Sequence, residues 1–200
     1  MYILESKFIV NKTIGQLNSG QITQLKKQFS FFPHYINNDN GEHQFTGANQ
    51  GIAISSADDS IVYFYQGESK EIDYQRIFDC IDAVRKLINK DEYDYVGMSL
   101  QGISNYEGDT MEASLKKLPD YKVDDIIAGI GVRVLCKNEE FNGEVKVEPF
   151  INDTEKIFNF GNSVSIEKVI VNEETFEKQH KKLIEIAEKI QTLSFDTQGL

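Results

Sequence analysis

The residues of this chain that could perform covalent chemistry are few. The segment Gly97-Met98-Ser99-Leu100-Gln101-Gly102 is one residue away from the G-x-S-x-G pattern that presents a nucleophilic serine. That pattern needs a sharp strand-to-helix turn, whereas the residues around Ser99 predict a continuous strand. A hydrolase would also need a later histidine, and the one that follows, His180, falls on the apolar stripe of a predicted helix. The pattern therefore favours a serine without a catalytic role.

Cofactor and metal motifs are equally weak. Gly129-Ile130-Gly131 begins like a dinucleotide-binding fingerprint, but residue 134 is valine and the pattern that follows predicts a strand instead of a helix. His34 and His43 flank a polar segment without a known metal-ligand spacing. We therefore expect no cofactor and no metal, and an enzyme is the less favoured class. Cys80 and Cys136 follow the apolar periods of their elements, which predicts buried, reduced thiols.

Acidic side chains are concentrated in the middle of the chain. The formal net charge is −11 at pH 7, and residues 39–125 hold 18 acidic against 8 basic side chains. A field of that sign repels nucleic-acid phosphates and anionic lipids. We therefore expect neither a nucleic-acid partner nor a membrane partner. The excess would suit a protein with a basic surface, or it could serve solubility alone.

Two long amphipathic helices are the clearest elements of the pattern. Asp73 is a good N-cap for the first, which is predicted over residues 73–90. Asn172 caps the second, predicted over residues 172–192, and residues 194–200 are expected to form a flexible tail. The apolar side chains of the first helix repeat every three or four positions: Ile77, Phe78, Ile81, Val84, Leu87 and Ile88. Shorter helices are expected after Gly20 and over residues 110–118.

Strands are predicted on both sides of the first long helix. Residues 51–65 have the pattern of a hairpin whose turn contains Asp58 and Asp59. Residues 93–103 alternate as a further strand. The segment 126–137 has few charges on either face, which predicts a central strand.

The remaining segments are predicted from local turn chemistry. Residues 35–44 are rich in Asn and Asp and are expected to form a loop. Residues 144–150 alternate as a half-exposed strand. Strands at 157–160 and 164–171 are expected to be separated by a turn at Gly161-Asn162.

The order of these elements predicts an α+β fold with a mainly antiparallel sheet, because hairpins, and not single helices, link the strands. We expect a single domain over residues 1–200. Strands followed by a helix occur twice, so degenerate halves over 1–94 and 95–193 are one interpretation. No stretch approaches the roughly 20 apolar residues that span a bilayer. Residues 1–10 lack the features of a signal peptide, which predicts a cytoplasmic protein.

The leading functional hypothesis is a non-catalytic acidic binding protein, such as an immunity, antitoxin or anti-defence type inhibitor of a basic partner. The lack of catalytic motifs and the local acidic excess motivate it. The candidate contact residues lie in predicted turns: Asp58, Asp59, Asp91, Glu92 and Asp94. The pattern leaves the oligomeric state open.

The alternative hypothesis is a small-molecule-binding or hydrolase-like domain with a pocket between the helices and the sheet. Its candidate residues are Ser99, Arg133, Tyr95 and His180. Arg133 stands out because it lies within an apolar strand pattern, and a buried arginine needs an anionic partner. A third interpretation, a scaffold or chaperone-like domain, would need exposed aromatic side chains around the polar segment: Phe31, Phe32, Tyr35 and Phe45.

Overall fold

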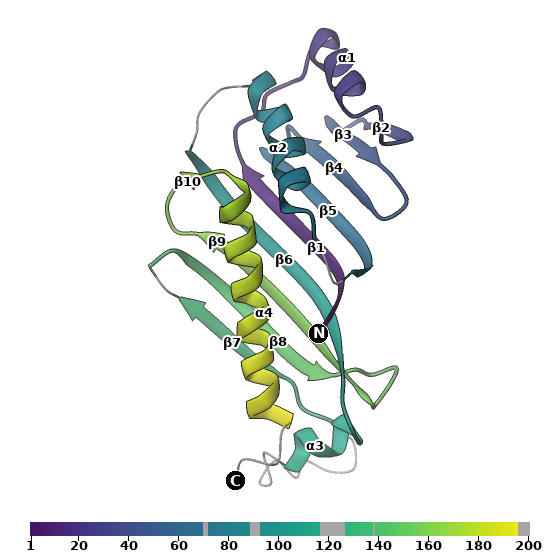
Figure 1. The fold of residues 1–200 in the computed structure, drawn as a ribbon, viewed down its shortest axis with the longest axis vertical. Helices are drawn as coiled ribbons and strands as arrows, with labels where there is room; N and C mark the ends of the chain where they lie inside the picture. Colours follow the sequence, from purple (N-terminus) through teal and green to yellow (C-terminus); the bar gives the residue numbers. More distant parts are fainter. Residues whose placement is uncertain (70–71, 89–92, 117–126, 138, 196–200) are drawn as a thin grey trace.

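The computed structural model describes the chain except for residues 70–71, 89–92, 117–126, 138 and 196–200. It is an α+β structure built on one large antiparallel sheet of ten strands. The described residues form four helices, and α2 and α4 cross the same face of the sheet (Figure 1). The predicted fold class is confirmed at this level.

The sheet has the strand order β2-β3-β4-β5-β1-β6-β9-β8-β7, and β10 pairs with the start of β6. Every described pairing is antiparallel. The strands are β1 (Tyr2–Asn11), β2 (His34–Asn38), β3 (Glu42–Thr46), β4 (Gln50–Ser55), β5 (Ser60–Ser69), β6 (Tyr93–Asn105), β7 (Val132–Lys137), β8 (Phe141–Pro149), β9 (Lys156–Ser165) and β10 (Val169–Ile170).

The helices are α1 (Ser19–Gln28), α2 (Tyr74–Ile88), α3 (Thr110–Lys116) and α4 (Glu173–Phe195). Asn18 and Gln21 form a capping box at the start of α1, so two backbone N–H groups are satisfied there. Asp73 accepts a hydrogen bond from the backbone N–H of Arg76 and caps α2, as its sequence pattern predicts.

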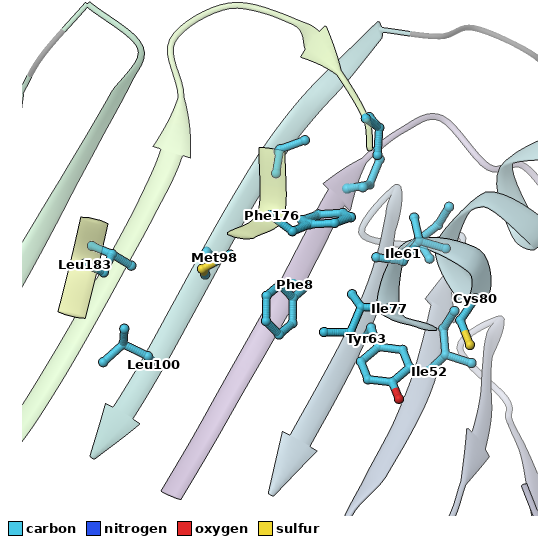
Figure 2. Close-up of a cluster of buried hydrophobic side chains, with 14 of the residues drawn as sticks. Phe8, Ile52, Ile61, Tyr63, Ile77, Cys80, Met98, Leu100, Phe176 and Leu183 are labelled. Carbon is cyan, nitrogen blue, oxygen red and sulfur yellow. The ribbon is translucent and has the colours of Figure 1, made fainter. Parts of the chain in front are cut away.

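The apolar core lies between the sheet and the helices. In the central strands β1 and β6, alternate side chains such as Phe8 and Met98 are buried on the helix side. From the helices, Ile77, Phe176 and Leu183 pack onto this face (Figure 2). The opposite face, which we call the open face, carries the intervening side chains. The predicted apolar stripe of α2 is therefore confirmed as a core contact.

Three predicted segments differ from the structure. Residues 34–46 form the hairpin β2–β3 instead of a loop. β9 runs unbroken through Gly161 and Asn162, because hydrogen bonds to both β6 and β8 outweigh the local turn preference. β7 is an edge strand and not a central one, and its Leu135 is 75% exposed. A pattern with few charges thus belongs to an exposed edge strand and not to a central one.

The last helix also ends later than the sequence predicts. α4 continues to Phe195, whose ring is buried and whose carbonyl oxygen accepts a hydrogen bond from Tyr106. Residues 194 and 195 are therefore helical, whereas the sequence predicts a flexible tail from residue 194 onward. Residues 196–200 lie outside the described part. No helix in the described residues is long and apolar enough to cross a membrane.

Candidate functional site

The turn between β4 and β5 carries two of the predicted contact residues, and both are exposed. Asp58 accepts a hydrogen bond from the hydroxyl of Ser55 at 2.9 Å. Asp59 has a φ of +46°, a left-handed conformation that aspartate tolerates better than most residues. Its carboxylate accepts a hydrogen bond from the backbone N–H of Ile14 at 3.0 Å. Local hydrogen bonds therefore hold both carboxylates in place.

Asp94 is a buried residue and not a surface contact. It is 2% exposed and lies at the start of β6. Its carboxylate accepts hydrogen bonds from Lys12 Nζ at 3.2 Å and from Arg85 Nε at 3.0 Å. Both cations are buried too, and Arg85 also lies 3.6 Å from Asp82. Each buried charge thus has a partner of opposite sign, as burial requires. We name these four residues, Lys12, Asp82, Arg85 and Asp94, the charged cluster.

Lys12 connects the charged cluster to the acidic turn. Its backbone N–H donates to the carbonyl oxygen of Asp59 at 2.7 Å, while its side chain binds Asp94. Lys12, Asp59 and Asp94 also line one hollow of about 450 Å³, together with Asp58, Tyr95 and other residues. The fold thus brings together predicted residues from two distant segments. Sequence reasoning missed Lys12 and Arg85, although each is a cation next to an apolar run.

Other turns place further carboxylates at the same end of the sheet. β1 and β9 end here, and β5, β6 and β8 begin here. The β2–β3 turn lies beside the β4–β5 turn, because the hydroxyl of Ser56 donates to the carbonyl of Gly41. We name as the acidic rim the exposed carboxylates of these turns: Asp39, Asp58, Asp59, Glu139, Glu140 and Glu167. Exposed lysines on the same segments are Lys137 and Lys168.

The open face has a different electrostatic arrangement. Glu5 lies 2.9 Å from Lys7, and Glu144 pairs with Arg133 and lies 3.8 Å from Lys146. The hydrogen bond from Arg133 is the main cause that lowers the pKa of Glu144. These carboxylates are therefore neutralised locally, whereas Asp58 and Asp59 form no ion pair with the described residues.

The residues of the alternative site are spread over the open face. Ser99 of β6 and Arg133 of β7 are separated by β9 and β8, which corresponds to roughly 14 Å at the usual strand spacing. Tyr95 lies four residues from Ser99 along β6, next to the acidic rim. Arg133 is exposed and paired with Glu144, so it is not the buried arginine that the sequence suggested. Asp91 and Glu92 lie outside the described residues.

His180 does not pair with Ser99. Its Nε2 lies 3.1 Å from the hydroxyl of Ser6, and its Nδ1 lies 2.9 Å from the hydroxyl of Tyr74. These three residues, the neutral cluster, lie on the helix side of the sheet, while Ser99 faces the other side. Burial lowers the pKa of His180 to about 4 and raises that of Tyr74 to about 12. Ser99 and His180 therefore do not form the serine–histidine pair that a hydrolase using Ser99 would need.

Two further candidate side chains for chemistry, Cys80 and His43, are buried. Burial raises the pKa of the Cys80 thiol to about 11, which disfavours the reactive thiolate. His43 is buried and bonded to the hydroxyl of Tyr35, and Phe31 is exposed while Phe32 and Phe45 are buried. In the part of the chain that the structure describes, no group of histidine, cysteine and acidic side chains could hold a metal ion. The chain matches no protein-family model, no curated protein and no solved structure.

Proposed function

We propose that the protein is a non-catalytic binding protein that docks a basic protein surface onto the acidic rim. An inhibitor of the immunity, antitoxin or anti-defence type is the specific form of this proposal. The observation that carries it is the gathering of exposed carboxylates from four separate turns at one end of the sheet. A surface on which one sign of charge is in excess steers the encounter with an oppositely charged partner.

The hydrogen bonds below the rim support the same role. Asp58 and Asp59 are held by Ser55 and by the backbone of Ile14, so little side-chain freedom is lost on binding. In this proposal Asp94 is a positioning residue and not a contact, since Lys12 links its carboxylate to the Asp59 turn. A preorganised rim favours a rigid and specific complex.

The rim variant of the test replaces carboxylates by amides: Asp58→Asn, Asp59→Asn, Glu139→Gln and Glu167→Gln. Asparagine keeps the acceptor oxygen of both turn residues and tolerates the left-handed backbone of Asp59. The matched control makes an equal change in net charge away from the rim, at exposed carboxylates: Glu107→Gln, Glu112→Gln, Glu155→Gln and Glu188→Gln.

The measurement is capture of a partner from the native cell extract by the wild type, the rim variant and the matched control. We expect the wild type and the control to retain the same basic protein and the rim variant to lose it. Equal capture by the rim variant, or the retention of no basic protein by any of the three, would contradict the proposal.

A further inference from the structure

A second hollow, of about 520 Å³, lies between the beginning of α4 and the sheet. Thr175, Lys178, Gln179 and Lys182 line it from one side of the helix, because their spacing of three or four residues places them on one helical face. The β7–β8 turn and the segment between β9 and β10 complete its wall. We name this feature the α4 hollow. Its volume falls within the usual range of small-molecule sites, roughly 300–1,000 Å³.

Gln179 has an unsatisfied acceptor at this hollow. The residue is 7% exposed, and its Oε1 atom is buried without a hydrogen-bond partner among the described residues. Buried polar atoms nearly always have a partner in a folded protein. The neighbouring His180 follows that rule, with a partner at each ring nitrogen. The last side-chain torsion of glutamine is soft, so this amide can meet an N–H donor that enters the α4 hollow.

Charges of both signs also line the α4 hollow. Lys178 pairs with Glu140, and Lys182 lies 3.2 Å from Glu185. Lys168 lines it as well and forms no ion pair with the residues that the structure describes. A cation is therefore left for an anionic group of a ligand.

The opposite charge and an apolar surface are present beside this cation. Glu167 lines the α4 hollow and has no cationic partner in the described part of the chain. Phe141 and Val169 add apolar surface, and Phe141 is buried. A purely anionic or purely cationic ligand would meet one of these charges unfavourably. A ligand with an N–H donor close to a carboxylate, on an apolar body, would match all of them.

We infer that the α4 hollow binds an α-amino acid group, with its N–H donated to Gln179 Oε1 and its carboxylate placed at Lys168. A free amino acid and the carboxyl terminus of a peptide share this chemistry. In the free amino acid the ammonium also faces Glu167. Glu167 also belongs to the acidic rim, but this inference needs neither a basic partner nor the turn of Asp58 and Asp59, so it can fail or hold independently of the proposed function.

The test is calorimetric titration of the full chain with the free L-amino acids, their N-acetyl derivatives and their carboxamides. An N-acetyl amino acid mimics the carboxyl terminus of a peptide, whereas a carboxamide lacks the carboxylate. We expect 1:1 binding of at least one free or N-acetyl amino acid and loss of binding for its carboxamide. Binding of the free form alone identifies free amino acids as the source, and binding of the N-acetyl form identifies chain termini.

Two glutamine variants of α4 make the test specific. Gln179→Met keeps the shape but removes the acceptor, and it should weaken binding roughly ten- to a hundredfold without lowering the urea midpoint. In Gln191→Met, an amide that donates to Ser104 and Asn159 is lost, so the midpoint should fall while the affinity stays. Unchanged affinity in Gln179→Met, equal binding of the carboxamide, or no binding of the panel up to about 10 mM would overturn the inference.

Discussion

The charged cluster and the neutral cluster solve the same structural problem with different chemistry. Each joins β1, or the residue that directly follows it, to α2 and to one further element, which is β6 through Asp94 or α4 through His180. Ser6 lies in β1 and Lys12 directly follows the strand, six residues further on, which is roughly 20 Å in an extended chain. The charged cluster lies next to the acidic rim, whereas the neutral one lies between β1 and the two long helices.

Position explains the difference. At the centre of the core, the rings of Phe8 and Tyr74 contact His180, with centroids 5.6 and 5.9 Å away, and an imidazolium there would lose its hydration. A neutral imidazole avoids that cost, because Ser6 and Tyr74 can serve its one donor and one acceptor. Near the rim, the Asp94 carboxylate can remain charged because it is shared by two cations, Lys12 and Arg85. We therefore expect the charged cluster to be sensitive to the loss of a partner and the neutral cluster to be sensitive to acid.

Removal of the Asp94 carboxylate should have the largest effect on stability. Asp94→Ala leaves Lys12 and Arg85 without the anion they share, and we expect a loss of about 3–5 kcal/mol in the free energy of unfolding. Glu185→Ala breaks an exposed ion pair with Lys182 and should cost at most about 1 kcal/mol. Urea unfolding of both variants measures the difference. If Asp94→Ala costs no more than Glu185→Ala, the Asp94 carboxylate does not hold the charged cluster together.

Acid should destabilise the neutral cluster through His180. Its pKa is about 4 in the folded protein, below the usual 6.5, so the unfolded chain binds more protons between these values. Stability should therefore fall as the pH decreases from about 6.5 and should level off below about 4, by up to about 3 kcal/mol.

The control for this pH effect is His180→Gln, which cannot titrate. Many carboxylates also titrate in this range, so the quantity to compare is the difference between wild type and variant in urea unfolding at pH 7 and at pH 4.5. If both lose the same stability, His180 is not the group responsible.

A single hydroxyl should have the smallest effect on stability. Tyr74→Phe removes the hydrogen bond to His180 Nδ1, and we expect a loss of about 1 kcal/mol. Tyr93→Phe changes an exposed ring and should be neutral. A double-mutant cycle with His180→Gln measures the coupling between the two side chains, and a coupling close to zero would mean that the neutral cluster does not act as a unit.

The sequence predicted elements whose apolar period is long and regular, and α2 is the clearest case. The sequence-based predictions were wrong where the conformation of a segment depends on partners that are distant along the chain. Gly161 and Asn162 have turn chemistry, but neighbours on both sides keep them in a strand. Arg133 lies in an apolar pattern, yet its strand is at the edge of the sheet and its charge meets Glu144 across the ladder.

The candidate site shows the same limit. Turn chemistry located the Asp58–Asp59 turn correctly, since Asp and Ser favour such positions by their local hydrogen bonds. The burial of Asp94 was not predictable, because its partners Lys12 and Arg85 are distant or lie on another element. The unsatisfied amide of Gln179 likewise has no sequence signal, since it depends on what surrounds the residue in the folded chain.

The association rate of the captured basic partner, measured at about 0.05 M and about 1 M salt, tests the acidic rim most directly. At 1 M salt the Debye length falls to roughly 3 Å, so electrostatic steering is screened. The wild type and the matched control should associate at least about tenfold more slowly at high salt, and the rim variant should be slow at both. Equal rates for the rim variant and the control, or a wild-type rate that is indifferent to salt, would contradict the proposed function.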